Sequence, residues 1–456
     1  MKRDLAALAQ ATGGVLHGDA VAFGTVTSDT RTLEPGALYV ALRGERFDGH
    51  DFVPEARARG AAAALVSRPA SVALPQVVVP DVLAGLSAFA TAWRGDFAGP
   101  VVGITGSNGK TTVKEMTGSI LGVEGSCLVT RGNLNNHIGV PLTLCRLEAG
   151  HRWAVIEMGA NHQGEIAHLA SLAKPDVGLV INAGPAHLEG FGGLEGVAKG
   201  KGELFAALGA GQTAVINADD AFADYWRGVA RGAGRVLTFG LRVPADFTAV
   251  DVVERTSAAG PSLEFDLVCP LGRVRVPLAL AGTHNVMNAL AAAAAAYAAG
   301  AGLESIVAGL AGMRAVAGRL EFKSLPGGGR LIDDSYNANP GSVRAGLQSL
   351  AALPGEKWLV LGEMRELGED SARLHAEIGD FARHCGITRL LAVGDDARHA
   401  VEAFGTGATW FASADDLIRS VAGQVGAGVT LMVKGSRSNR LERVAAGLGA
   451  SAGEGH

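Results

Sequence analysis

A glycine-rich loop that ends in Lys110 and Thr111 contains residues of the types that bind phosphate. Its members are Gly106, Ser107, Asn108, Gly109, Lys110, Thr111 and Thr112, and they follow the apolar run 101–104. Glycines let backbone N–H groups curl around phosphate oxygens, the lysine supplies charge to the β- and γ-phosphates, and the hydroxyl of Thr111 can hold Mg²⁺. Ile104 occupies the first glycine position of the strict phosphate-loop motif, so an ordinary glycine-rich turn is the alternative. We expect a nucleoside triphosphate site.

Two polar residues follow further apolar runs. Glu157 ends the run 153–157, and His187 comes shortly after the run 177–182. Ligands of open parallel sheets bind at the carboxyl ends of the strands, so Glu157 is a candidate Mg²⁺ ligand. A loop histidine is often structural or solvated. For His187 we therefore keep two interpretations, a structural or solvated side chain and a ligand.

The second half of the chain contains two more polar motifs. Asn285 and Asn288 lie three residues apart and therefore on one helix face, where they could contact adenine or cap the helix. Arg319 follows Gly318, and Asp334 belongs to the polar loop 333–340 after an apolar strand. Two adjacent acids at that point favour a ligand-facing loop over a simple turn.

These residues need elements that bring them to one sheet edge. Strand-like runs alternate with helical patterns between 101 and 217 and again between 330 and 433, which is typical of βαβ units. Short apolar runs and an alanine-rich helix at 55–64 indicate a smaller α/β unit before them. We expect an α/β protein of three domains: a small N-terminal domain (1–82), a central parallel-sheet ATPase domain (83–313) and a C-terminal Rossmann-like domain (314–456).

Composition excludes several other classes of protein. The 456 residues include 45 acidic and 40 basic ones, a net charge of −5 that gives no general reason to bind nucleic acid. The four cysteines form no CxxC pair, which argues against a zinc knuckle or a disulfide scaffold. The alanine-rich segment 289–299 is too short to span a bilayer, and the amino terminus lacks the pattern of a secretory signal. We expect a cytoplasmic monomer without membrane insertion.

The order of these motifs resembles the Mur ligases, three-domain ATP-dependent amide-forming enzymes of peptidoglycan synthesis. The segments 28–31 with 47–52, 335–340 and 361–375 resemble the branch of that family that adds D-alanyl-D-alanine. The Asp-Asn-Pro-Arg motif usual in the branch that adds the third amino acid does not occur in the sequence. The resemblance implies a reaction of ATP, UDP-N-acetylmuramoyl-tripeptide and D-alanyl-D-alanine through an acyl phosphate.

The resemblance also implies roles for individual residues. The residues of catalysis would be Lys110, Glu157, His187, Lys201 and Arg319, and the Mg²⁺ ligands would be Thr111, Glu157, His187 and Lys201. ATP would bind at 106–112, with Asn285 and Asn288 near adenine, Arg319 near the γ-phosphate and Asp334 near the ribose. The other substrates would contact Ser28, Asp29, Arg31, Asn135, Asn136, Lys434 and Arg437.

Lys201 illustrates how the resemblance changes an interpretation. By spacing alone it is an exposed helix lysine between Lys199 and Glu203, and its replacement by alanine should leave the melting temperature almost unchanged. It matches a lysine that members of the family carry as a carbamate, an anion that can hold a metal.

Other functions remain open at this point. A different muramyl-peptide ligase or a folylpolyglutamate synthase would share the phosphate loop, but a folate ligase should lack the block 28–52. A phosphate-loop ATPase or a regulatory nucleotide-binding protein would form no amide bond. A scaffold without catalysis is disfavoured because nothing structural requires Lys110, Glu157 and Arg319 together. The third residue of the tripeptide, meso-diaminopimelate or lysine, is not specified by the sequence.

Overall fold

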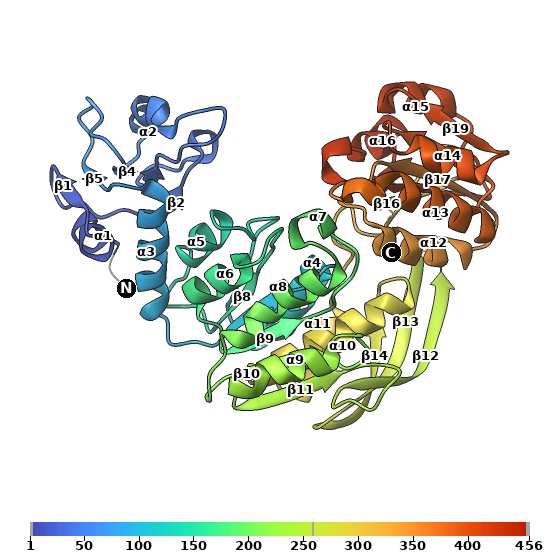
Figure 1. The fold of residues 1–456 in the computed structure, drawn as a ribbon, viewed down its shortest axis with the longest axis horizontal. Coiled ribbons are helices and arrows are strands. Elements are labelled where there is room, and N and C mark those ends of the chain that lie inside the picture. Colours follow the sequence, from blue (N-terminus) through green and yellow to red (C-terminus); the bar gives the residue numbers. More distant parts are fainter. Residues whose placement is uncertain (1–2, 258–259, 453–456) are drawn as a thin grey trace.

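The computed structural model describes residues 3–257 and 260–452, and Figure 1 shows them as three lobes, each built around its own sheet. The first lobe has a five-stranded sheet in the order β1-β5-β4-β3-β2, parallel except for β1. Its strands are β1 (Val15–His17), β2 (Val26–Thr27), β3 (Leu38–Val40), β4 (Ala63–Val66) and β5 (Gln76–Val78). Its helices are α1 (Leu5–Thr12) and α2 (Val53–Ala58), and α3 (Val82–Gly95) leads to the second lobe.

The helix predicted at 55–64 is shorter in the structure. Helix α2 ends at Ala58, and Gly60 adopts a φ of 87°, the left-handed conformation that commonly ends helices. The chain then turns directly into β4, so the prediction was wrong for the second half of this segment.

The second lobe contains an entirely parallel six-stranded sheet in the order β11-β10-β9-β6-β8-β7. Its strands are β6 (Val101–Thr105), β7 (Cys127–Val129), β8 (Trp153–Glu157), β9 (Val177–Val180), β10 (Thr213–Asn217) and β11 (Arg235–Phe239). Its helices are α4 (Lys110–Gly122), α5 (Gly139–Leu144), α6 (Glu165–Ala173), α7 (Leu188–Phe191), α8 (Leu194–Ala206), α9 (Ala223–Val229), α10 (Thr283–Ala298) and α11 (Leu303–Ala311). Because β6 lies between β8 and β9, the segments that follow these three strands meet at one sheet edge.

An antiparallel sheet was not predicted for this lobe. It consists of β12 (Thr248–Ser257), β13 (Gly260–Cys269) and β14 (Gly272–Leu278), and in Figure 1 it lies beside α10 below the third lobe. Most of the alanine-rich segment 289–299 is buried, and it belongs to α10 as far as Ala298. No helix in the described parts of the chain is long and apolar enough to cross a membrane.

The third lobe has a seven-stranded sheet in the order β19-β18-β17-β20-β16-β15-β21. Its strands are β15 (Glu321–Ser324), β16 (Arg330–Asp334), β17 (Glu356–Gly362), β18 (Arg389–Val393), β19 (Ala408–Phe411), β20 (Val429–Lys434) and β21 (Ser451–Ala452). Its helices are α12 (Pro340–Ala351), α13 (Ser371–His384), α14 (Arg398–Phe404), α15 (Ala414–Val421) and α16 (Glu442–Gly447). Strand-like runs were expected between 330 and 433, and β16, β17, β18 and β20 of that region lie in the parallel part of this sheet.

Candidate active site

A cavity of about 810 Å³ lies where the second and third lobes meet. It is lined by most of the residues that the sequence singled out: Ser107, Asn108, Gly109, Lys110, Thr111, Thr112, Asn135, Asn136, Glu157, His187, Asn285, Asn288, Arg319, Asp334, Lys434 and Arg437. The structure therefore brings together motifs that are separated by more than half of the chain. The candidates outside this lining are Gly106, Lys201 and three residues of the first lobe, Ser28, Asp29 and Arg31.

The glycine-rich loop connects β6 to α4 and has the form of a phosphate site. Gly109 has a φ of 83°, and a Cβ there would lie 2.6 Å from Oδ1 of Asn288, so only glycine fits. Lys110 donates from Nζ to the carbonyl of Gly106 at 2.7 Å, and burial lowers the pKa of its ammonium. The ammonium lies at the start of α4, where the helix dipole also favours an anion.

Asn108, at the tip of this loop, is bonded from both lobes. Its backbone N–H donates to Oδ1 of Asn182 at 2.9 Å, and Nδ2 of Asn182 donates to its carbonyl at 3.2 Å. From the third lobe, Nδ2 of Asn339 donates to Oδ1 of Asn108 at 2.7 Å. Asn339 also caps α12, because its Oδ1 accepts from the N–H of Ser342. Asn182 and Asn339 carry no sequence motif that would have predicted these bonds.

Glu157 is buried at the end of β8, and both of its carboxylate oxygens have partners. Oε2 accepts from the hydroxyl of Thr111 at 3.1 Å, and Oε1 accepts from Nδ2 of Asn135 at 2.8 Å. The backbone N–H of Glu157 donates to the hydroxyl of Thr130. The strand end, the loop threonine and Asn135 thus hold the carboxylate at the cavity wall.

Lys114 is a second cation beside this carboxylate, and it was not predicted from the sequence. Its side chain is fully buried, with Nζ 3.8 Å from Oε2 of Glu157 and 3.0 Å from a carboxylate oxygen of Glu115. Nζ also donates to the carbonyl of Thr130 at 2.7 Å. Spacing could have revealed it, because residues three apart on a helix share a face and Lys114 follows Thr111 by three.

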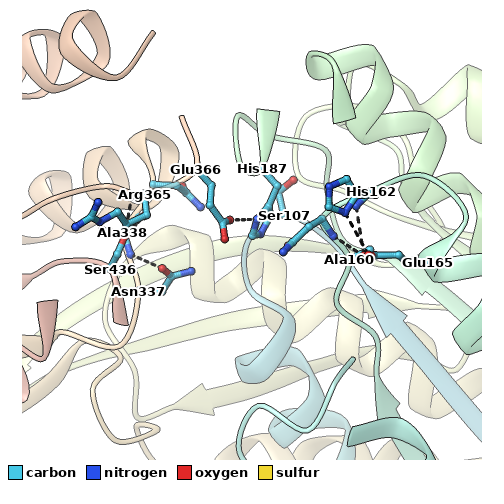
Figure 2. A network of polar contacts seen from close by, with 12 residues as sticks. Ser107, Ala160, His162, Glu165, His187, Asn337, Ala338, Arg365, Glu366 and Ser436 are labelled. Atoms are coloured by element: carbon cyan, nitrogen blue, oxygen red, sulfur yellow. Dashed lines mark hydrogen bonds and ion pairs between the residues drawn. The ribbon is translucent and has the colours of Figure 1, made fainter. Parts of the chain in front are cut away.

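His187 contacts the third lobe. Its Nδ1 is paired with a carboxylate oxygen of Glu366, and Figure 2 shows the two side chains pointing towards each other from different lobes. Both residues have left-handed backbones, with φ of 56° and 62°. The hydrogen bond with His187 holds the pKa of the Glu366 carboxyl below its ordinary value. Glu366 was not predicted, since only the fold brings it to His187.

Lys201 is buried, so its interpretation as an exposed lysine was wrong. Glycines at 200 and 202 let Phe191 and Trp226 pack closely against this stretch of α8 and cover it. Nζ donates to the carbonyl of Ala160 at 3.3 Å and lies 5.1 Å from the ring centroid of Phe191. Burial lowers the pKa of Lys201 to about 7, so a large share of the amine is uncharged at neutral pH.

The donor atoms that line the cavity suit Mg²⁺, which is bound partly by water and substrate phosphates, better than a metal that is coordinated by protein side chains alone. No group of three or more His, Cys, Asp or Glu side chains suited to a metal occurs among residues 3–257 and 260–452. Mg²⁺ is usually held by one or two carboxylates together with water and substrate phosphates. Glu157, the Thr111 hydroxyl and His187 line the same cavity as the phosphate loop and can complete such a site. Lys201 lies outside that lining, and its role as a ligand stays a prediction.

The two asparagines of α10 do not cap the helix. Gly282 is the N-cap residue and makes no side-chain cap bond, whereas Asn285 donates to the carbonyl of Ala281 at 2.7 Å. Nδ2 of Asn288 donates to Oδ1 of Asn285 at 2.9 Å. The capping alternative was therefore wrong, and contact with adenine remains a prediction.

The third lobe presents cations to the phosphate loop. Arg319 donates from a guanidinium nitrogen to the Thr111 hydroxyl at 2.9 Å and stacks on Tyr336, 4.3 Å from the ring centroid. Asp334 is paired with the buried Lys434 at 2.6 Å. The loop that follows β16 thus faces the cavity, which excludes the interpretation of a simple turn.

The substrate candidates of the other lobes differ in their surroundings. Asn136 accepts backbone N–H bonds at the start of α5, whereas Asn135 contacts Glu157. Asp29 and Arg31 are paired with each other at 2.7 Å in the first lobe. Figure 1 shows that lobe around the upper end of α3, at the opposite end of the molecule from the third lobe.

Comparison with known proteins places these features in one family. Residues 23–91 match the Mur ligase family catalytic domain, 104–296 the Mur ligase middle domain, and 318–437 the glutamate ligase domain of Mur ligases. The chain is similar to the UDP-N-acetylmuramoyl-tripeptide--D-alanyl-D-alanine ligase of Escherichia coli (strain K12), with 46% identity over 97% of this chain and 98% of the relative. It is 37% identical to the protein of that name from Haemophilus influenzae, over 92% of each chain.

Solved structures agree with this likeness. A crystal structure of MurF from Acinetobacter baumannii has a TM-score of 0.90 and 36% identity, covering 98% of this chain and 99% of that one. The MurF ligase of Thermotoga maritima in complex with ADP has a TM-score of 0.80 and 28% identity, covering 93% and 96%. FolC of E. coli shares the fold alone, with 16% identity and a TM-score of 0.62 over 79% of this chain and 92% of that one.

Proposed function

The chain belongs to the Mur ligase family, and we propose that it joins D-alanyl-D-alanine to UDP-N-acetylmuramoyl-tripeptide with ATP. The products are UDP-N-acetylmuramoyl-pentapeptide, ADP and phosphate, a step of peptidoglycan precursor synthesis. The observation that carries the proposal is the 46% identity along nearly the whole length of a ligase of that name. The gathering of the phosphate loop, Glu157 and Arg319 in one cavity supports it.

The first chemical step brings two anions together. The terminal carboxylate of the tripeptide attacks the γ-phosphorus of ATP, and ADP leaves as an acyl phosphate forms. Lys110 and Arg319 lie on opposite lobes around the loop and can offset the negative charge as it develops. Mg²⁺ held by Glu157, Thr111 and His187 would neutralise further charge on the phosphates.

The second step forms the amide. The dipeptide ammonium first gives up a proton, the resulting amine attacks the acyl carbon, and the tetrahedral intermediate loses a second proton from nitrogen as it expels phosphate. Acyl phosphates hydrolyse readily, so water has to be kept out of the cavity. The bonds of Asn339 to Asn108 and of Arg319 to Thr111 hold the third lobe over the loop and can serve this purpose.

The buried amine of Lys201 suits carbamate formation. In its neutral form the nitrogen attacks the carbon of CO₂ and loses a proton, which leaves an anion in place of an ammonium. A pKa of about 7 makes the neutral form abundant at physiological pH. The carbamate would contribute negative charge to the metal side of the cavity.

The remaining assignments complete the proposal. The first lobe, residues 1–82, holds the UDP end through Ser28, Asp29 and Arg31, and residues 83–313 and 314–456 form the other two domains. Because the cavity is closed by two lobes of the same chain, a monomer suffices for catalysis. ATP and a UDP-linked precursor are cytoplasmic metabolites, so we place the reaction in the cytoplasm.

Release of ADP, measured with each tripeptide in the presence and absence of D-alanyl-D-alanine, tests the function. We expect ADP and the pentapeptide, identified by mass, to form only when both substrates are present. The tripeptides containing meso-diaminopimelate and lysine show which third residue is accepted. ADP release that is independent of the muramyl substrate would instead identify an ATPase, and activity with a folate would identify a folate ligase.

A further inference from the structure

We propose that Glu366 binds the ammonium group of the incoming dipeptide. This inference rests on the proposed function, which requires a zwitterionic second substrate beside the acyl phosphate. The ammonium has to find an anion close to the phosphate loop, although the third lobe presents mainly cations there. Glu366 lies where such an anion is needed, at the contact between the third lobe and His187 (Figure 2).

Three acidic residues of the third lobe near the site already have cationic partners within that lobe. These pairs are Asp333 with Lys323 at 2.7 Å, Asp334 with Lys434 at 2.6 Å and Glu363 with Arg365 at 2.5 Å. Glu366 differs from them, because its ion-pair partner is His187 of the second lobe. That pair uses Oε2 of the carboxylate. Half of the side chain is exposed, so a ligand can reach it.

Glu366 lies beside the cavity. It is not itself a lining residue, but it contacts His187, which lines the cavity together with Lys110 of the phosphate loop. An ammonium held by Glu366 would therefore place the dipeptide nitrogen near the acyl phosphate. The same ammonium would separate the carboxylate from the phosphate charges.

The backbone fixes Glu366 relative to Arg437, a candidate for the dipeptide carboxylate. The N–H of Arg365 donates to the hydroxyl of Ser436 at 2.9 Å, and the N–H of Ser436 donates to the carbonyl of Glu363 at 3.1 Å. These bonds join the loop after β17 to the loop after β20. Glu366 and Arg437 thus sit on two connected loops, with opposite charges for the two ends of a zwitterion.

The backbone of Glu366 is itself unusual. A φ of 62° is rare for a residue with a long side chain, and such conformations persist where the surroundings hold them, frequently at functional sites. Here the conformation directs the carboxylate out of the third lobe, as Figure 2 shows.

Glu366→Gln, compared with Glu369→Gln, tests the inference. Glu369 is exposed in the same loop and is not assigned to the site. We expect Glu366→Gln to raise KM for D-alanyl-D-alanine 10-fold or more, with KM for ATP and for UDP-tripeptide within 2-fold of wild type. Glu369→Gln should match wild type, and Glu366→Asp, which keeps the charge, should show a smaller rise.

An analogue without the amino group separates binding of the ammonium from other roles. N-propionyl-D-alanine is D-alanyl-D-alanine without that group, and its inhibition constant should be the same within 2-fold for wild type and Glu366→Gln. Equal weakening of the analogue and the dipeptide would overturn the inference. So would an unchanged dipeptide KM with a greater need for Mg²⁺, since Glu366 would then act only on His187. If wild type and Glu369→Gln both form no pentapeptide, the proposed function fails instead.

Discussion

Replacing Lys201 by methionine should remove a large part of the dependence of stability on pH between pH 7 and pH 9. The ammonium of Lys201 is almost completely removed from solvent, and its polar partner is the carbonyl of Ala160. Burial lowers the pKa of Lys201 to about 7, against an ordinary value of 10.5 that the unfolded chain regains. Methionine has a similar shape but no charge to bury.

The size of the effect follows from the two pKa values. Between pH 7 and pH 10.5 the unfolded chain binds more protons than the folded chain, so the free energy of unfolding rises with pH. The whole difference corresponds to about 5 kcal/mol, of which roughly 2 kcal/mol falls between pH 7 and pH 9. The stability of wild type relative to Lys201→Met should therefore rise by roughly 2 kcal/mol across that interval.

Urea unfolding in bicarbonate-free buffer with EDTA measures this difference without a carbamate or a metal. Lys199→Met is the matched control, because Lys199 is exposed two residues away in α8. Its stability should follow that of wild type at every pH. A difference between wild type and Lys201→Met that stays constant from pH 7 to pH 9 would refute the argument from burial.

Three further substitutions test the cations around the cavity. Lys110→Ala should abolish pentapeptide formation, because the lysine charge acts on the transferred phosphoryl group. The free energy of unfolding should stay within about 1 kcal/mol of wild type, because the side chain bonds mainly to loop carbonyls. ADP release and urea unfolding check this, and normal turnover would disprove it. Arg319→Ala should lower kcat more than it raises KM for UDP-tripeptide, since its expected partner is the γ-phosphate; steady-state kinetics that show a change in KM alone would contradict this role. Lys114→Met should lower the free energy of unfolding by about 3 kcal/mol, since it leaves the buried Glu157 without its cation. Adding Glu157→Gln should recover part of that loss in urea unfolding, and no recovery would argue against the pair.

The parallel sheets could be predicted because their strands are continuous apolar runs. β6 and β8 begin and end within one residue of the predicted runs; the loop after β6 carries the phosphate site, and Glu157 is the last residue of β8. The sheet β12–β14 was missed. Its outer face carries pairs of opposite charge, such as Arg273 with Asp266, and its register shifts between Val250 and Val253, which interrupts the alternation.

The unpredicted parts of the site depend on packing between distant segments. Lys201 stands in a polar stretch of sequence, and only the cover of Phe191 and Trp226 removes it from solvent. Glu366 becomes part of the site because the third lobe brings it to His187. Neither relation leaves a local pattern, whereas glycine spacing and strand ends do.

The hydrogen bonds of Asn108 to both lobes couple two equilibria: nucleotide binding by the phosphate loop and docking of the third lobe on that loop. If the loop binds nucleotide more tightly when Asn339 of the third lobe is docked on it, thermodynamic linkage requires nucleotide to favour docking by the same factor. A change at Asn339 would then alter nucleotide affinity without touching the nucleotide. Asn182 bonds Asn108 from within the second lobe and would therefore limit how far the loop can move when the third lobe docks. The coupling energy would be measurable from nucleotide affinity alone, in a cycle of Asn108 and Asn339 variants.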